Sequence, residues 1–66
     1  MALKWVDIYD IAIDLEETHP QADILRISFT DLWQKVIDLD DFQDEPNNSS
    51  EKILEAIQAA WLDERD

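Results

Sequence analysis

Hydrophobic residues recur at helical spacing in three stretches of the chain. The first stretch carries its apolar residues on one side and acidic residues on the other, which is typical of an amphipathic helix. The apolar members are Ile8, Ile11, Ala12 and Leu15, and the acidic members are Asp10, Asp14 and Glu17. Asp7 is a good N-cap residue, and Pro20 disfavours helical geometry at the residue before it. The pattern predicts a helix over Asp7–Thr18.

A second helix is expected to begin after Thr30, which is the predicted N-cap. Its apolar arc comprises Leu32, Trp33, Val36, Ile37 and Leu39, and its polar arc comprises Asp31, Gln34, Asp38 and Asp41. Asp40 falls inside the apolar arc. We therefore expect the helix to end or turn near Asp40 or Asp41, and Phe42 to fold back onto the core.

The third helix is predicted over Ser49–Asp63, with Asn48 as N-cap and Glu51 as its capping-box partner. Its wide apolar arc predicts that it is the most buried helix, with Leu62 partly exposed and Glu64, Arg65 and Asp66 frayed. The arc consists of Ile53, Leu54, Ala56, Ile57, Ala60 and Trp61. Residues 20–28 favour a turn and a short extended segment. The sequence thus predicts one mainly α domain over residues 1–66, with at most a minimal short β segment.

Composition limits what can hold this domain together and what it can bind. With 66 residues and no cysteine, packing must replace disulfides or thiolate metal sites, and Trp5 and Trp61 are expected in the core. The net charge of −12 opposes binding to nucleic acid or anionic membranes and favours basic partners. No apolar run approaches a membrane span, and the first residues lack a signal-peptide pattern, so a cytoplasmic location is expected.

The acidic residues of the second helix and the following turn form the main candidate site. Asp31, Asp38 and Asp41 project to one side of a helix, and Asp44 and Glu45 follow them in the chain. Oxygen-rich faces can bind hard cations or iron, or dock a partner's Arg and Lys cluster. A solvated face that only confers solubility is the alternative to both. The sequence contains no nucleophile–base pair or glycine-rich phosphate loop, so no enzymatic activity is expected.

With these residues in view, the chain resembles the IscX (YfhJ) family, small acidic proteins of bacterial iron–sulphur cluster assembly. The resemblance covers essentially the whole chain. It is carried by Leu3-Lys4-Trp5, Phe29-Thr30-Asp31-Leu32, Leu39 with Asp41-Phe42, Asp44-Glu45-Pro46, and the run Glu51 to Gln58 followed by Trp61-Leu62. The chain departs from the family pattern at Trp33 and Lys35, where the family usually has His and then Trp.

The resemblance implies a three-helix, winged-helix-like fold and a non-catalytic adaptor or regulator that binds the cysteine desulfurase. It also implies weak iron binding by surface carboxylates, for which Asp38, Asp41, Asp44 and Glu45 are the candidates. Ferredoxin or frataxin would compete for the same enzyme, and the protein would be a monomer. The partner-binding candidates are Asp31, Trp33, Gln34, Lys35, Asp38, Asp41, Asp44 and Glu45.

Two other functions compete with the adaptor. One is an iron donor that acts mainly through its carboxylates. The other is a winged-helix nucleic-acid binder, which fold alone suggests and the net charge opposes.

Overall fold

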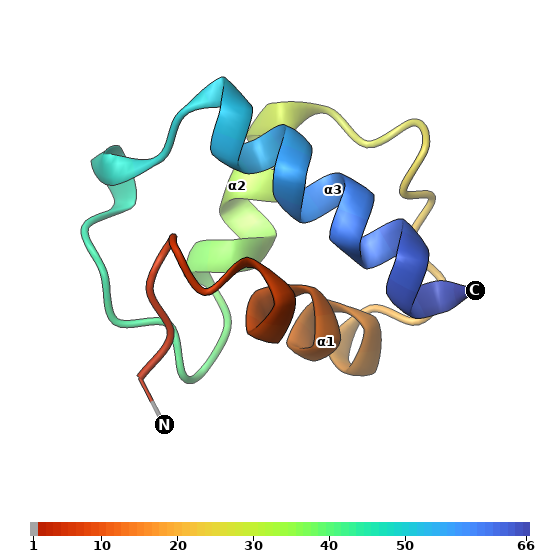
Figure 1. Ribbon diagram of the computed structural model, residues 1–66, viewed down its shortest axis with the longest axis horizontal. Helices are drawn as coiled ribbons and strands as arrows, with labels where there is room; N and C mark the ends of the chain where they lie inside the picture. Colours follow the sequence, from red (N-terminus) through yellow and green to blue (C-terminus); the bar gives the residue numbers. More distant parts are fainter. Residues whose placement is uncertain (1) are drawn as a thin grey trace.

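The computed structural model describes residues 2–66 and consists mainly of helices (Figure 1). Helix α1 spans Ile8–Thr18, α2 spans Phe29–Ile37 and α3 spans Glu51–Arg65, with a short 3₁₀ helix, η1, over Pro46–Asn48. α1 and α3 lie side by side, and α2 contacts both of them. This arrangement confirms the predicted mainly α class. Within residues 2–66 the only β-type pairing is a parallel bridge between Leu3 and Phe42, and the winged-helix-like arrangement stays a prediction.

One hydrophobic core is built from all three helices and from the segments between them. Its buried members are Leu3, Trp5, Ile11, Ala12, Leu15, Ile24, Leu32, Val36, Leu39, Leu54, Ile57, Ala60 and Trp61. The predictions for Trp5 and Trp61 are confirmed, since their exposed fractions are 1% and 0%. Leu62 is partly buried, as expected.

The three tryptophans also connect segments that are distant in the sequence. The indole N–H of Trp5 donates to the Glu45 carbonyl at 2.8 Å, and that of Trp33 donates to the Pro46 carbonyl at 2.8 Å. The indole of Trp61 donates to Glu16 Oε1 at 3.0 Å. Each side chain therefore combines apolar burial with one directed bond, which serves a chain that has no disulfide.

The N-terminal segment packs against the turn that follows α2. The Leu3 N–H donates to the Asp41 carbonyl at 2.7 Å, and the Gln43 N–H donates to the Leu3 carbonyl at 2.9 Å. Trp5 meets Phe42 edge to face, with ring centroids 4.9 Å apart. The prediction that Phe42 folds back onto the core is confirmed.

The helix caps differ from the predicted ones, although the helices themselves are where the periodicity placed them. Ser28, not Thr30, caps α2: its Oγ accepts from the Asp31 N–H at 3.1 Å. Ser50, not Asn48, caps α3: its Oγ accepts from the Ile53 N–H at 3.2 Å. In each case two good capping residues stand two positions apart, Ser28 and Thr30 or Asn48 and Ser50, and the sequence pattern does not show which of them caps the helix.

Three further expectations were met only in part. Asp7 stands at the predicted N-cap position of α1, but its carboxylate accepts from the Lys4 N–H at 3.0 Å and makes no side-chain cap. α2 ends at Ile37, and the chain then turns through residues 38–41, which confirms the turn expected near Asp40 or Asp41. Residues 24–26 form a turn in place of the expected extended segment.

The C-terminus is also ordered, contrary to the prediction of fraying. α3 continues to Arg65, whose guanidinium bonds Glu16 of α1 at 2.9 Å and the His19 carbonyl at 3.0 Å. It donates to the Ala22 carbonyl as well. Arg65 therefore joins the ends of α1 and α3 to the loop between α1 and α2.

Candidate acidic docking surface

Carboxylates from α1 and from the turn after α2 surround two adjoining hollows. One hollow is lined by Asp14, Thr18, Asp38, Leu39, Asp40 and Asp41. The other is lined by Leu3, Asp10, Ile13, Asp14, Glu17 and Asp41. Asp14 and Asp41 line both hollows, so the two form one continuous surface. We call the six carboxylates Asp10, Asp14, Glu17, Asp38, Asp40 and Asp41 the acidic surface.

The fold places these carboxylates together for simple local reasons. α1 buries Ile11, Ala12 and Leu15, so Asp10, Asp14 and Glu17 are left on its outer side. The turn after α2 is fixed by two backbone bonds, from the Leu39 N–H to the Val36 carbonyl at 3.1 Å and from the Phe42 N–H to the Leu39 carbonyl at 3.0 Å. Among residues 2–66, no Lys or Arg side chain lines either hollow. The charged side chains in this described lining are therefore all acidic.

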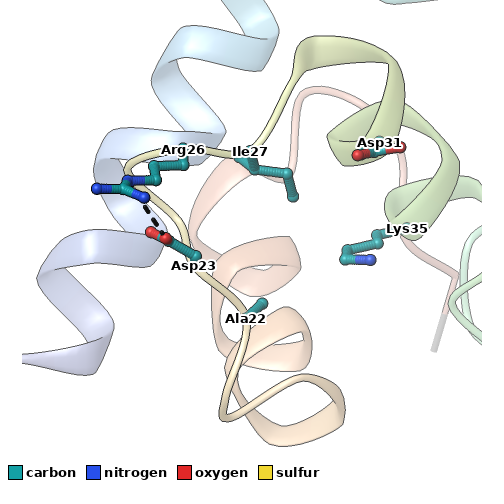
Figure 2. Close-up of a pocket in the computed structure, with 6 residues that line it drawn as sticks. All are labelled: Ala22, Asp23, Arg26, Ile27, Asp31 and Lys35. Carbon is teal, nitrogen blue, oxygen red and sulfur yellow. Dashed lines mark ion pairs between the residues drawn. The ribbon is translucent and has the colours of Figure 1, made fainter.

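Asp31 and Lys35, both predicted partner-binding residues, line a different hollow (Figure 2). They project from α2 across this hollow from Arg26 and Asp23, which form an ion pair at 3.8 Å. Ala22 and Ile27 complete its lining. Two cations thus share this hollow with two carboxylates, so it lacks the uniform charge of the acidic surface.

Trp33 and Gln34 also have identifiable surroundings. The half-buried Trp33 lines a shallow hollow with Phe29, Thr30 and Leu54, and its indole is held by the Pro46 carbonyl. The Gln34 side-chain amide donates to Asp38 Oδ1 at 3.0 Å and thereby orients that carboxylate. The role of either residue in partner binding stays a prediction.

Asp44 is held by the fold more firmly than its neighbour Glu45. Its carboxylate accepts from the Trp5 N–H at 3.1 Å and from the Glu45 N–H at 2.7 Å. These bonds, that of Trp5 first, lower the pKa of Asp44 because they favour its charged form. Glu45 is exposed, and its carbonyl receives the Trp5 indole. Asp44 therefore fastens the loop before α3 to the N-terminal segment.

The four predicted iron ligands do not form a ready metal site. Among residues 2–66 no group of three or more His, Asp or Glu side chains is placed to hold a metal ion. Asp44 already accepts two backbone N–H groups, and Asp38 accepts from Gln34. An iron ion would therefore find few protein ligands in this arrangement, and weak iron binding stays a prediction.

The sequence did not single out four of the six carboxylates of the acidic surface. Asp10, Asp14 and Glu17 were recognised only as the polar side of the first helix, and Asp40 only as a break in the second. The spacing of four and three residues between Asp10, Asp14 and Glu17 did place these three side chains on one side of a helix. Which other segment that side would face depends on how α1 packs, and no local pattern reports this. Within residues 2–66, no helix is both long enough and apolar enough to cross a membrane.

Fold and surface together define a small helical protein with a cation-poor acidic surface, and comparison with known proteins supplies its family. Residues 3–66 match the family described as "Iron-sulphur cluster assembly", which is the IscX (YfhJ) family. The chain is 52% identical to the "Uncharacterized protein PA3808" of Pseudomonas aeruginosa, over 100% of both chains. The chain belongs to this iron–sulphur cluster assembly family. The family supports a role in iron–sulphur cluster assembly.

Proposed function

We propose that the protein is an acidic adaptor of iron–sulphur cluster assembly that docks onto the cysteine desulfurase and regulates it. Family membership supports the process, and the acidic surface supports the mode of binding. The observation that carries the proposal is the joining of carboxylates from two segments around hollows that no Lys or Arg side chain of residues 2–66 lines. An interface that matches this surface requires a cluster of Arg and Lys side chains on the partner.

Electrostatic docking of this kind has a definite physical signature. Opposite charges mainly accelerate association, and salt screens them over a Debye length of about 8 Å at physiological ionic strength. We therefore expect the affinity for the desulfurase to fall steeply as salt is added. The protein itself needs no catalytic group for this role, because it acts by occupying or reshaping a surface of the enzyme.

The proposal is tested by charge reversal. Affinity for the purified desulfurase of the same organism is measured by calorimetry at several salt concentrations, for the natural chain and for Asp38→Lys/Asp41→Lys. The double variant should bind at least about tenfold more weakly at low salt and show a shallower salt dependence. Glu64→Lys/Asp66→Lys makes the same change in net charge at residues that line neither hollow, and should change the affinity much less.

Unchanged affinity of the Asp38/Asp41 variant at low salt would contradict docking through this surface. An equal loss in both variants would mean that only total charge matters. The iron-donor alternative is separated by anaerobic titration with ferrous iron, followed by backbone NMR. Selective broadening around Asp38–Glu45 would support direct iron binding, and its absence would remove the donor function while leaving the adaptor intact.

A further inference from the structure

Exposed apolar side chains lie along the outer side of α1, beside the acidic surface. Val6 and Tyr9 are each 77% exposed, and Ile13 is 41% exposed. Tyr9 and Ile13 are four residues apart in α1, which places them on one side of the helix, and Val6 lies in the turn that leads into it. Large apolar residues exposed singly need no explanation, but a row of them on one side of an element indicates a binding surface. We call these three residues the α1 ridge.

The α1 ridge is continuous with the acidic surface. Ile13 lines the same hollow as Asp10, Asp14, Glu17 and Asp41. An apolar strip bordered by charges has the anatomy of a binding interface, in which buried apolar anchors are ringed by polar groups.

A second hollow flanks the ridge on the side of α3. It has a volume of about 270 Å³ and is lined by Ile8, Tyr9, Ala56, Ala59, Ala60 and Asp63. Most of the lining side chains are apolar. An apolar side chain of a partner could enter this hollow beside the Tyr9 ring.

The charge of the protein decides which occupant fits. A second copy would bring a further net charge of −12 to a surface that is already acidic, which opposes self-association. A partner with an apolar patch surrounded by Arg and Lys would satisfy both the ridge and its border.

We propose that the α1 ridge, with Tyr9 at its centre, is the apolar anchor of the interface through which the protein docks onto the cysteine desulfurase. This proposal rests on the proposed function and adds to it the residues that supply most of the affinity for the desulfurase. The acidic surface sets the association rate and its salt dependence, whereas the ridge slows dissociation in a way that salt barely changes.

The test compares matched substitutions at several salt concentrations, again by calorimetry with the purified desulfurase. Tyr9→Ala should weaken binding about tenfold or more, by a similar factor at every salt concentration. Tyr9→Phe, which keeps the ring, should retain most of the affinity. Leu25→Ala is the control, because Leu25 is also 77% exposed but lies in the turn at residues 24–26 and lines neither hollow beside the ridge. It should bind as the natural chain does.

The possible failures can be told apart. If Asp38→Lys/Asp41→Lys weakens binding but Tyr9→Ala and Ile13→Ala do not, the ridge is not an anchor and the adaptor function stands. If the natural chain does not bind the desulfurase at all, both proposals fall. If the chain forms dimers that Tyr9→Ala dissolves, the ridge contacts a second copy and the proposed occupant is wrong.

Discussion

Replacing Arg65 by alanine should destabilise the protein strongly, although this residue stands one position from the C-terminus. Its guanidinium donates to the carbonyls of His19 and Ala22, which lie after the end of α1. It also pairs with Glu16 at 2.9 Å and lies over the Trp61 ring, 5.7 Å from the centroid. One side chain thus connects the last turn of α3 with α1, with the next loop and with a core tryptophan.

The expected loss follows from these contacts. Two hydrogen bonds from a charged donor to backbone carbonyls contribute about 1 kcal/mol each in a partly exposed site. Packing on Trp61 adds roughly 0.5–1 kcal/mol. Arg65→Ala should therefore lower the free energy of unfolding by about 2–3 kcal/mol, before any contribution of the Glu16 pair. A 66-residue chain is stabilised by roughly 3–10 kcal/mol in total, so the loss is a large fraction.

Urea denaturation followed by tryptophan fluorescence and circular dichroism measures this loss. Arg65→Lys should recover part of the stability, because an ammonium keeps the charge but cannot present the planar fork. Arg26→Ala is the matched control: its side chain is 89% exposed and, among residues 2–66, pairs with Asp23 alone at 3.8 Å, so we expect a change within about 0.5 kcal/mol. If the two alanine variants had the same urea midpoint, the role assigned to Arg65 would be refuted.

Two further predictions concern the caps and the response to acid. Ser28→Ala should cost about 1 kcal/mol in urea unfolding because the Asp31 N–H loses its acceptor, whereas Thr30→Ala should cost much less; equal costs would contradict the observed cap. Bonds from Arg65 first, and then from Trp61, lower the pKa of Glu16 from its ordinary value of 4.5, and the pKa of Asp44 is lowered from 3.8. A lowered pKa means that the folded state binds protons less readily than the unfolded state, so stability present above these values is lost as the pH falls through and below them. Thermal unfolding between pH 6 and pH 2.5 should show this loss, and Glu16→Gln should show a smaller one; an unchanged pH profile in that variant would exclude Glu16 as a contributor.

The helices of this protein were predictable because their apolar residues follow the helical repeat. In α3, for example, Leu54, Ile57, Ala60 and Trp61 recur at spacings that place them on one side, and all four are buried. The caps were harder to predict, because Ser28 and Thr30 are both good capping residues and the choice depends on the path by which the chain enters the helix. The prediction of an extended segment after Pro20 is wrong, because a β-branched residue there is explained by its burial and not by a strand. Ile24 lies in the core, and its carbonyl accepts from the Gln58 side chain.

The sequence predicted that the candidate site is acidic, but it did not predict which carboxylates belong to it. Asp38 and Asp41 could be selected from sequence, since they follow the polar arc of the second helix to its end. Asp44 looked equivalent to them, yet its carboxylate is occupied by the backbone N–H groups of Trp5 and Glu45. A sequence does not distinguish a carboxylate that is hydrogen-bonded within the protein from one that is available to a partner. Only the tertiary partner, here 39 residues away along the chain, distinguishes them.

The same charges that suit the protein to a basic partner work against its own fold. A net charge of −12 within a radius of gyration of 10.4 Å is self-repulsive, and the core of so short a chain is small. The long-range bonds of Trp5, Trp61 and Arg65 oppose this repulsion at the places where α1, α3 and the loops meet. Among residues 2–66, Asp10, Asp14 and Asp40 have no such bond, so they contribute repulsion in the free protein that the proposed cationic partner would relieve on binding. Salt should therefore act in opposite directions on the two properties, since screening weakens docking and stabilises the free chain. If the proposed docking is correct, a more stable free protein at high salt should therefore accompany weaker binding to the partner.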